Sequence, residues 1–360
     1  MNGLDDVIAA ETVLSDVDGK AGRLVIRGRT VEDLARSATF EDVVAILLDG
    51  FFDHLPRRHA LYAAIGAARV ECYDRLAPHL AIMDNLTPVE ALRAGLSLLP
   101  DGDGLDTALR LLAAPAVITA AKLRRDRGAT PLAPDPDLAH SVDFLRMVHG
   151  QMPRDEDARG LDAYLATVSD HGMNASTFAA RTVASTQAGL VSAGIAGLCA
   201  LKGPLHGGAP GPVLDMLDAI GKPENAQVWL AAALARGDRL MGFGHRIYRV
   251  RDPRADALKA AIGRLGSTGV VGGRLALAEA VEAAALQLLR EAKPDRPLDT
   301  NVEFYTAVLL EALGFPASAF TCVFAAGRMT GWIAHAREQL LTGRLIRPQS
   351  RYVGEVPQAA

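Results

Sequence analysis

The chain has few cysteines and few aromatic residues. Its three cysteines, Cys72, Cys199 and Cys322, are widely spaced and form no CxxC pair. This pattern predicts neither a disulfide framework nor a thiolate metal site, and we expect a reduced, cytoplasmic setting. Aromatic residues make up only 5% of the chain, so we expect a core of small aliphatic side chains.

Strong charge and long apolar runs are also missing. The net charge of −4 gives no general attraction to nucleic acid. Asp5 and Asp6 stand where a secretory signal would need basic residues. The most apolar stretch lies within 178–201, but polar residues such as Arg181 and Gln187 interrupt it, which favours a buried helix over a membrane span. We therefore expect neither a nucleic-acid partner nor a membrane partner.

The common nucleotide and metal motifs do not occur. The string GFGHRI at 242–247 begins like a dinucleotide-binding motif, but Ile247 stands in the place of the third glycine and no strand–helix unit surrounds it. The sequence contains no GxxxxGK[ST], HExxH or His-x-His string. These patterns predict neither a P-loop nor a bound metal.

Length and periodicity predict a helical protein of two or three structural units. Residues 7–28 are typical of a short β-hairpin that turns at 18–20, and strands are nearly absent after residue 30. Apolar residues then recur at three- and four-residue spacing, and Pro115 is expected to kink or divide its helix. The predicted helices cover 31–37, 40–50, 55–69, 87–99, 105–124, 138–149, 155–168, 174–201, 209–219, 224–236, 253–265, 274–292, 301–313 and 317–342. The predicted fold class is all-α.

The predicted helix 174–201 is rich in small residues. Gly189, Gly194 and Gly197 leave room for the backbone of a neighbouring helix to approach closely. The neighbour can belong to the same subunit or to a second one, and the sequence leaves both open.

Two histidines lie in glycine-rich surroundings that suit ligand binding. His206 follows a glycine-proline turn and precedes two glycines, which expose backbone N–H groups. His245 stands between glycines and four arginines of the segment 246–254, a cluster that suits an anionic substrate. Each also fits a structural role, as a loop histidine before a helix or as part of a solvated basic turn before a helix that starts near Pro253.

Two charged residues on predicted helices are further candidates. Glu303 would lie in the first helical turn after the N-cap Asn301, where the helix dipole favours a carboxylate even without catalysis. Arg328 lies among small apolar residues, so we expect it to have an anionic partner. His335, seven residues further on, is interpreted as a core histidine that donates a structural hydrogen bond.

These strings, taken together, resemble the citrate synthase family. The matching segments, in family order, are DHGMNASTFAARTVAST with His171, LKGPLHGGA with His206, GFGHRIYRVRDPRA with His245, NVEFYTA with Glu303 and FTCVFAAGRMTGWIAHAREQ with Arg328. The opening AETVLSDVDGKAGRLVIRG resembles the N-terminal hairpin of the family, and RLIRPQSRYVG resembles its terminal tail. The resemblance therefore runs along nearly the whole chain.

The resemblance implies a mainly helical fold of two domains, with a short N-terminal β-hairpin. The large domain would comprise 1–209 plus 311–360 and the small domain 210–310, with the active site in the cleft between them. The expected assembly is a homodimer with shared active sites. The implied reaction condenses acetyl-CoA with oxaloacetate, a 2-oxo dicarboxylate, to give citrate and CoA. It needs no metal and no cofactor, since the CoA thioester is a substrate.

The resemblance also implies residue roles. Glu303 matches the base that deprotonates the acetyl methyl, His206 the donor to the enolate oxygen, and His245 the acid that polarises the ketone. The matching binding positions are His171, Arg254 and Arg328 for the dicarboxylate, Arg347 donated by the other subunit, and Arg249 for CoA phosphate.

The sequence departs from the family pattern around the base. The family ordinarily has aspartate where Glu303 stands, and serine-glycine where Thr306 and Ala307 stand. Three hypotheses stay open: a citrate synthase, a 2-methylcitrate synthase that uses propionyl-CoA, and a binding or regulatory paralogue of low activity. The two enzymes differ by one methylene in the acyl pocket, which is worth only about 1–3 kcal/mol.

Overall fold

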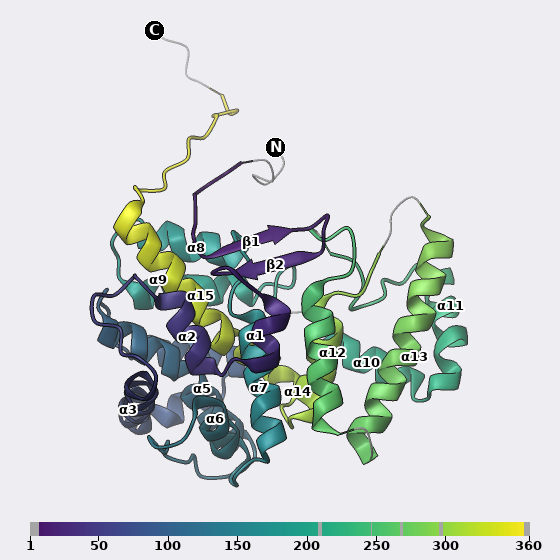
Figure 1. Cartoon of the computed structure of the whole chain (residues 1–360), viewed down its shortest axis with the longest axis horizontal. Helices are drawn as coiled ribbons and strands as arrows, with labels where there is room; N and C mark the ends of the chain where they lie inside the picture. Colours follow the sequence, from purple (N-terminus) through teal and green to yellow (C-terminus); the bar gives the residue numbers. More distant parts are fainter. Residues whose placement is uncertain (1–6, 208–210, 246, 267–268, 295–297, 356–360) are drawn as a thin grey trace.

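A computed structural model of the chain describes residues 7–207, 211–245, 247–266, 269–294 and 298–355 (Figure 1). Fifteen α-helices and three short strands make up this part of the chain. The strands are β1 (Ser15–Asp18), β2 (Arg23–Ile26) and β3 (Arg29–Thr30). The prediction of an all-α fold with an N-terminal hairpin is confirmed.

The helices follow most of the predicted segments. They are α1 (Val31–Ser37), α2 (Phe40–Leu48), α3 (His59–Leu76), α4 (Pro88–Leu96), α5 (Leu105–Asp126), α6 (His140–His149), α7 (Asp155–Val168), α8 (Ala175–Ala184), α9 (Leu190–Leu201), α10 (Gly211–Ile220), α11 (Ala226–Ala235), α12 (Pro253–Leu265), α13 (Gly269–Ala292), α14 (Val302–Ala312) and α15 (Phe320–Thr342). Pro115 lies inside α5, which is not divided there.

Local sequence signals explain where several helices begin. Thr39 and Asp42 form a capping box at α2, since each side chain accepts a hydrogen bond from the backbone of the other. Asn301 caps α14 by accepting the N–H of Glu303. Asp252 caps α12, with Pro253 at its first position. The predicted starts near 253 and 301 are confirmed.

The prediction of one helix over 174–201 is wrong, because the structure has two, α8 and α9. Gln187 and Gly189 between them have left-handed backbone angles, with φ of 62° and 98°. The carboxylate of Asp101 accepts the N–H groups of Val191 and Ser192 and so caps the second helix. This cap comes from a loop some ninety residues away, so the local sequence does not reveal the break.

The strands form one antiparallel sheet in the order β1-β2-β3. In the hairpin, Ser15 pairs with Ile26 and Asp18 with Arg23. The strands begin at residue 15, later than the predicted segment 7–28. In Figure 1 the hairpin lies beside α1 and above α12.

Helix α15 passes through the core and packs against α5, α7, α8 and α9. Its glycines make this possible. A Cβ on Gly327 would lie 2.6 Å from the Val168 side chain, and one on Gly331 would lie 2.2 Å from the Ser169 carbonyl oxygen. The end of α7 can therefore lie directly against α15, which brings the segment before His171 close to Arg328.

Helices α10, α11 and α13 are grouped on one side of the molecule (Figure 1). All three fall within 210–310, the predicted small domain. The domain boundaries themselves stay a prediction. Among the described residues, no single helix has the length and apolar character to cross a membrane; α14 together with 317–342 meets those two criteria only as a pair bent by 119°.

One carboxyl group in the core makes stability depend on pH. Asp162 Oδ1 accepts hydrogen bonds from Phe40 N at 3.0 Å and from Ser141 Oγ at 2.5 Å. Burial raises the pKa of Asp162 to about 7, so the fold favours the protonated acid. Asp162 therefore contributes fully to the free energy of unfolding below its unfolded-state pKa of about 4. This contribution is lost as the pH rises through 7.

We expect Asp162→Asn to become more stable relative to the unsubstituted protein as the pH rises from 5 to 8. The asparagine oxygen still accepts both hydrogen bonds but never has to ionise. Thermal unfolding at several pH values measures the difference, with the exposed Asp106→Asn as a control that should show no such trend. A difference in melting temperature that stays constant with pH would contradict the assignment.

Candidate active site

A short backbone pairing brings two distant segments of the candidate site together. Gly244 N donates to the Asp299 carbonyl at 2.7 Å, and Asn301 N donates to the Gly242 carbonyl at 3.0 Å. Gly242 and Gly244 have φ of 86° and 84°, in the left-handed region that glycine adopts readily. A Cβ on Gly242 would also lie 2.7 Å from the Phe304 ring. These contacts bring the His245 loop against the start of the helix that carries Glu303.

The carboxylate of Asp252 holds three parts of this region together. It accepts the N–H of Arg254 at 3.0 Å and so caps α12. It forms a two-bond ion pair with the Arg254 guanidinium, at 3.0 and 2.8 Å. Its Oδ2 also accepts the N–H of Val302, the first residue of α14, at 3.2 Å. Both charged side chains are almost fully buried, so the pair is fixed in place.

His245 is held as a neutral donor. Its Nδ1 accepts hydrogen bonds from Ile247 N at 3.0 Å and Tyr248 N at 3.1 Å. Burial and the nearby Arg254 lower the pKa of His245 to about 4. Because Nδ1 acts as an acceptor, the single hydrogen of the neutral ring lies on Nε2. This nitrogen lies 3.4 Å from Arg254 Nη2.

His171 lies next to His245, with ring centroids 5.7 Å apart. Tyr248 contacts both rings: its hydroxyl lies 3.1 Å from His171 Nε2, and its ring centroid lies 4.8 Å from that of His245. Burial, together with Arg254 and Arg328, lowers the pKa of His171 well below its ordinary value. His171 is therefore also neutral at pH 7.

His206 follows α9 in a turn closed by a hydrogen bond from its N–H to the Gly203 carbonyl. Its Nε2 lies 2.8 Å from Ser176 Oγ. That oxygen also accepts the indole N–H of Trp332 at 3.2 Å and donates its hydrogen to Asn174 Oδ1 at 2.8 Å. Burial, with the charges of Arg328 and Arg254, lowers the pKa of His206 to about 4.

Glu303 lies in the first turn of α14. Its Oε2 is fully covered and has no hydrogen-bond partner among the described residues. Burial raises its pKa to about 7, with Arg254 acting in the opposite direction and Asp252 adding to the rise. A carboxyl group with this pKa can accept and release a proton near neutral pH.

Arg328 is a buried cation without an anionic partner among the residues that the structure describes. Only 1% of it is exposed, and its one hydrogen bond in the described structure goes from Nε to the Val168 carbonyl, at 2.6 Å. No carboxylate of the described residues forms an ion pair with it. Burial lowers its pKa to about 10, so it stays charged at pH 7. A buried guanidinium in this state predicts an anionic ligand.

A polar network near Arg328 joins four elements. Asp170 accepts hydrogen bonds from Ser15 Oγ at 2.5 Å and from His335 Nε2 at 3.1 Å. Nδ1 of His335 in turn lies 2.9 Å from the Arg181 guanidinium. The structural role predicted for His335 is confirmed. The network fixes the backbone at Asp170, and with it the neighbouring His171.

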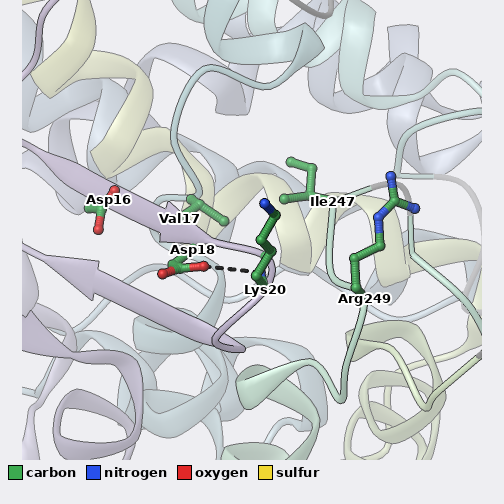
Figure 2. Close-up of a pocket in the computed structure, with 7 residues that line it drawn as sticks. Asp16, Val17, Asp18, Lys20, Ile247 and Arg249 are labelled. Atoms are coloured by element: carbon green, nitrogen blue, oxygen red, sulfur yellow. Dashed lines mark hydrogen bonds between the residues drawn. The ribbon is translucent and has the colours of Figure 1, made fainter.

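Arg249 lies at a surface hollow of about 450 Å³ that borders the site (Figure 2). The hairpin turn forms the other side of the hollow, with Lys20 opposite Arg249. Arg249 N donates to the Gly19 carbonyl at 2.8 Å, and a Cβ on Gly19 would lie only 2.3 Å from the Ile247 carbonyl oxygen. The charged lining of the hollow consists of the two exposed cations and the carboxylates of Asp16 and Asp18.

Two expected arginines lie elsewhere. Arg251 forms ion pairs with Asp256 and Glu282, at 2.6 and 2.7 Å, and so has a structural role. Arg347 is exposed in the C-terminal tail, which extends away from the helices of this chain (Figure 1). Arg246 falls outside the described residues.

The structure thus brings His245 next to both His171 and Arg254. The charges of Arg254 and Arg328 contribute to lowering the pKa values of His171 and His206. Glu303 follows Val302, whose N–H binds Asp252, the ion-pair partner of Arg254. Sequence reasoning missed four contributors: Asp252, Tyr248, Ser176 and Asp170.

Within the described part of the chain, no three His, Cys, Asp or Glu side chains are gathered so that they could hold a metal ion. The arrangement suits proton transfer next to a bound anion.

Comparison with known proteins identifies the family. The model of the citrate synthase C-terminal domain matches residues 3–349. The chain belongs to the citrate synthase family. It is therefore an acyltransferase of the type that catalyses the condensation typical of this family.

Relatives within the citrate synthase family carry two kinds of name. The chain is 39% identical to putative citrate synthase 2 of Mycobacterium tuberculosis, over 99% of this chain and 94% of the relative. It is 36% identical to 2-methylcitrate synthase of the same organism, over 98% and 90%. A solved citrate synthase from Thermoplasma acidophilum, in a ternary complex with carboxymethyl coenzyme A and oxaloacetate, superposes with a TM-score of 0.85 at 28% identity, over 99% and 97%.

We expect Arg328→Met to abolish anion binding without destabilising the fold. Removing a buried, unpaired charge leaves the free energy of unfolding unchanged or higher. The affinity for oxaloacetate should fall at least about 100-fold, which corresponds to about 2.7 kcal/mol. Titration calorimetry measures the affinity and thermal unfolding the stability.

A control lies on the same helix. Arg337 contacts Phe51 and Asp103 carbonyl oxygens, away from the candidate site. Arg337→Met should lower stability but leave oxaloacetate binding intact. The reverse pattern in the two variants would show that Arg328 is structural.

Proposed function

We propose that the protein condenses acetyl-CoA with oxaloacetate to give citrate and CoA. The observation that supports this most strongly is Arg328, a buried guanidinium with no anionic partner in the described part of the chain, beside three neutral histidines and a carboxyl group with a pKa near 7. A dianionic 2-oxo acid supplies the missing negative charge, and the carboxyl group supplies the base.

In the proposed mechanism, Glu303 removes a proton from the methyl group of the thioester. The methyl is a weak carbon acid, so the developing enolate oxygen needs a donor at the same moment. His206 supplies it as a neutral imidazole that the Ser176 oxygen holds in place at Nε2. A neutral imidazole suits this role because it donates without changing the charge of the site.

The enolate carbon then attacks the ketone carbon of oxaloacetate. A new carbon–carbon bond forms, and the ketone oxygen becomes an alkoxide that takes the Nε2 hydrogen of His245. Arg254, Arg328 and His171 hold the dicarboxylate in position. Water then hydrolyses the citryl thioester and releases CoA, whose phosphate groups we place at Arg249. This sequence uses donors fixed before the reaction starts, which is an efficient way to stabilise developing charge.

We also propose the division into a large domain, 1–209 plus 311–360, and a small domain, 210–310. The candidate residues support it because they come from both parts. His171, His206 and Arg328 belong to the large domain, whereas His245, Arg254 and Glu303 belong to the small one. A movement of one part against the other would open and close the site to substrates.

The alternative activity is 2-methylcitrate synthesis from propionyl-CoA. It is favoured by the 36% identity to a 2-methylcitrate synthase, close to the 39% identity to the citrate synthase relative. The extra methylene changes the free energy of the transition state by only about 1–3 kcal/mol. Relative kcat/KM values for the two thioesters decide between the activities.

We expect release of the CoA thiol from acetyl-CoA in the presence of oxaloacetate, with a rate that rises with pH through about 7 as Glu303 ionises. Glu303→Gln should lower kcat by on the order of 100- to 10,000-fold and keep oxaloacetate binding. A thiol assay with acetyl-CoA and propionyl-CoA measures the release of CoA, and calorimetry measures the binding of oxaloacetate. Thiol release with neither thioester would leave only a binding or regulatory role.

We propose further that the protein is a homodimer in which Arg347 completes the site of the partner subunit. Mixing His245→Ala and Arg347→Ala subunits should restore about one quarter of the normal activity, since half of the dimers are mixed and each contains one intact site. Each variant alone should be nearly inactive. No restoration after mixing and refolding, or a fully active monomer in ultracentrifugation, would exclude shared sites.

A further inference from the structure

Helix α7 carries a buried hydroxyl group that the mechanism above does not use. Tyr164 is 0% exposed, and its hydroxyl has no hydrogen-bond partner among the described residues. Leaving a buried hydroxyl unpaired costs about 1–3 kcal/mol, so native cores rarely do so without a reason.

The surroundings of Tyr164 are those of the candidate site. Helix α7 packs against both α14 and α15, the helices of Glu303 and Arg328. Burial raises the pKa of the Tyr164 phenol, the carboxylate of Glu303 raises it further, and the guanidinium of Arg328 acts in the opposite direction. The Thr306 hydroxyl, one turn after Glu303, lies beside the phenol but outside hydrogen-bond geometry.

Two buried polar atoms without partners among the described residues therefore lie on two helices that pack against each other. Within the described ranges, the phenol is a donor without an acceptor, and Glu303 Oε2 is an acceptor without a donor. The two residues come from different helices, α7 and α14. Asp252 and Ser176, by contrast, already have partners: Asp252 binds Arg254, and Ser176 contacts His206.

We propose that Tyr164 is a positioning residue that donates its O–H to Oε2 of Glu303 when the carboxylate is ionised. The inference rests on the proposed role of Glu303 as the base. A glutamate has one more rotatable bond than the aspartate usual in the family, so its carboxylate needs an additional contact to keep a single orientation. The phenol supplies that contact, and no proton is transferred, because the phenol stays protonated at all pH values of interest.

The test is Tyr164→Phe, which removes only the hydroxyl. We expect kcat to fall about 10-fold, because misplacing a base by a fraction of an ångström slows proton transfer. The apparent pKa of the acidic limb of the kcat profile should rise by about one unit, because the ionised carboxylate loses a donor. The KM for oxaloacetate and the melting temperature should stay unchanged, and a small rise in melting temperature would fit the removal of an unpaired hydroxyl.

A double-mutant cycle and a control make the result specific. In the Glu303→Asp background the shorter carboxylate no longer reaches the phenol, so Tyr164→Phe should have less than a twofold effect. Tyr73→Phe removes a hydroxyl that donates to the Pro131 carbonyl at 3.2 Å, outside the site, and should leave the pH profile unchanged.

The inference would be overturned if folded Tyr164→Phe kept both its kcat and the acidic limb of its pH profile. It would also be overturned if circular dichroism showed loss of the fold, because the hydroxyl would then be structural. Either result leaves the proposed function intact as long as Glu303→Gln is inactive. Conversely, an active Glu303→Gln variant would remove the proposed base itself, whatever Tyr164→Phe does.

Discussion

The ion pair between Asp252 and Arg254 is the interaction on which the rest of the candidate site depends. One carboxylate satisfies the N-terminus of α12, the guanidinium of Arg254 and the first N–H of α14. Two helices and the loop of His245 therefore share a single buried anchor. Because a buried carboxylate is stable only when all its contacts are made, the anchor fixes Arg254 and Glu303 together, rather than each separately.

The charges around this anchor follow a simple pattern. Asp252 neutralises Arg254, whereas Arg328 has no such partner in the described structure, so one positive charge is left for a ligand. The same positive field and burial hold the pKa values of the three histidines well below the ordinary range. Neutral histidines serve as hydrogen-bond donors at pH 7 and do not compete with the arginines for the anion. The site thus keeps the binding of charge separate from the donation of hydrogen bonds.

The glutamate at position 303 is the point where this protein differs most from its family resemblance. Its carboxyl group reaches further than that of an aspartate, yet the helix start around it is ordinary: Asn301 caps the helix, and Asp252 binds Val302 N. Any adaptation to the longer side chain must therefore lie in what surrounds the carboxyl group. Burial, Arg254 and Asp252 act on it there, and Tyr164 is the residue that we propose to orient it.

The sequence by itself determined the fold class, most helix positions and the candidate residues, because helical periodicity, caps such as Asn301 and short motifs around His171, His206 and His245 are local properties of the chain. It did not reveal the break at 185–189, which depends on Asp101. Nor did it reveal the parts played by Asp252, Tyr248 and Ser176. The tertiary structure decided these because a buried polar group is defined by its partners, and the partners of Asp252, Tyr248 and Ser176 include groups from 30 to 156 residues away.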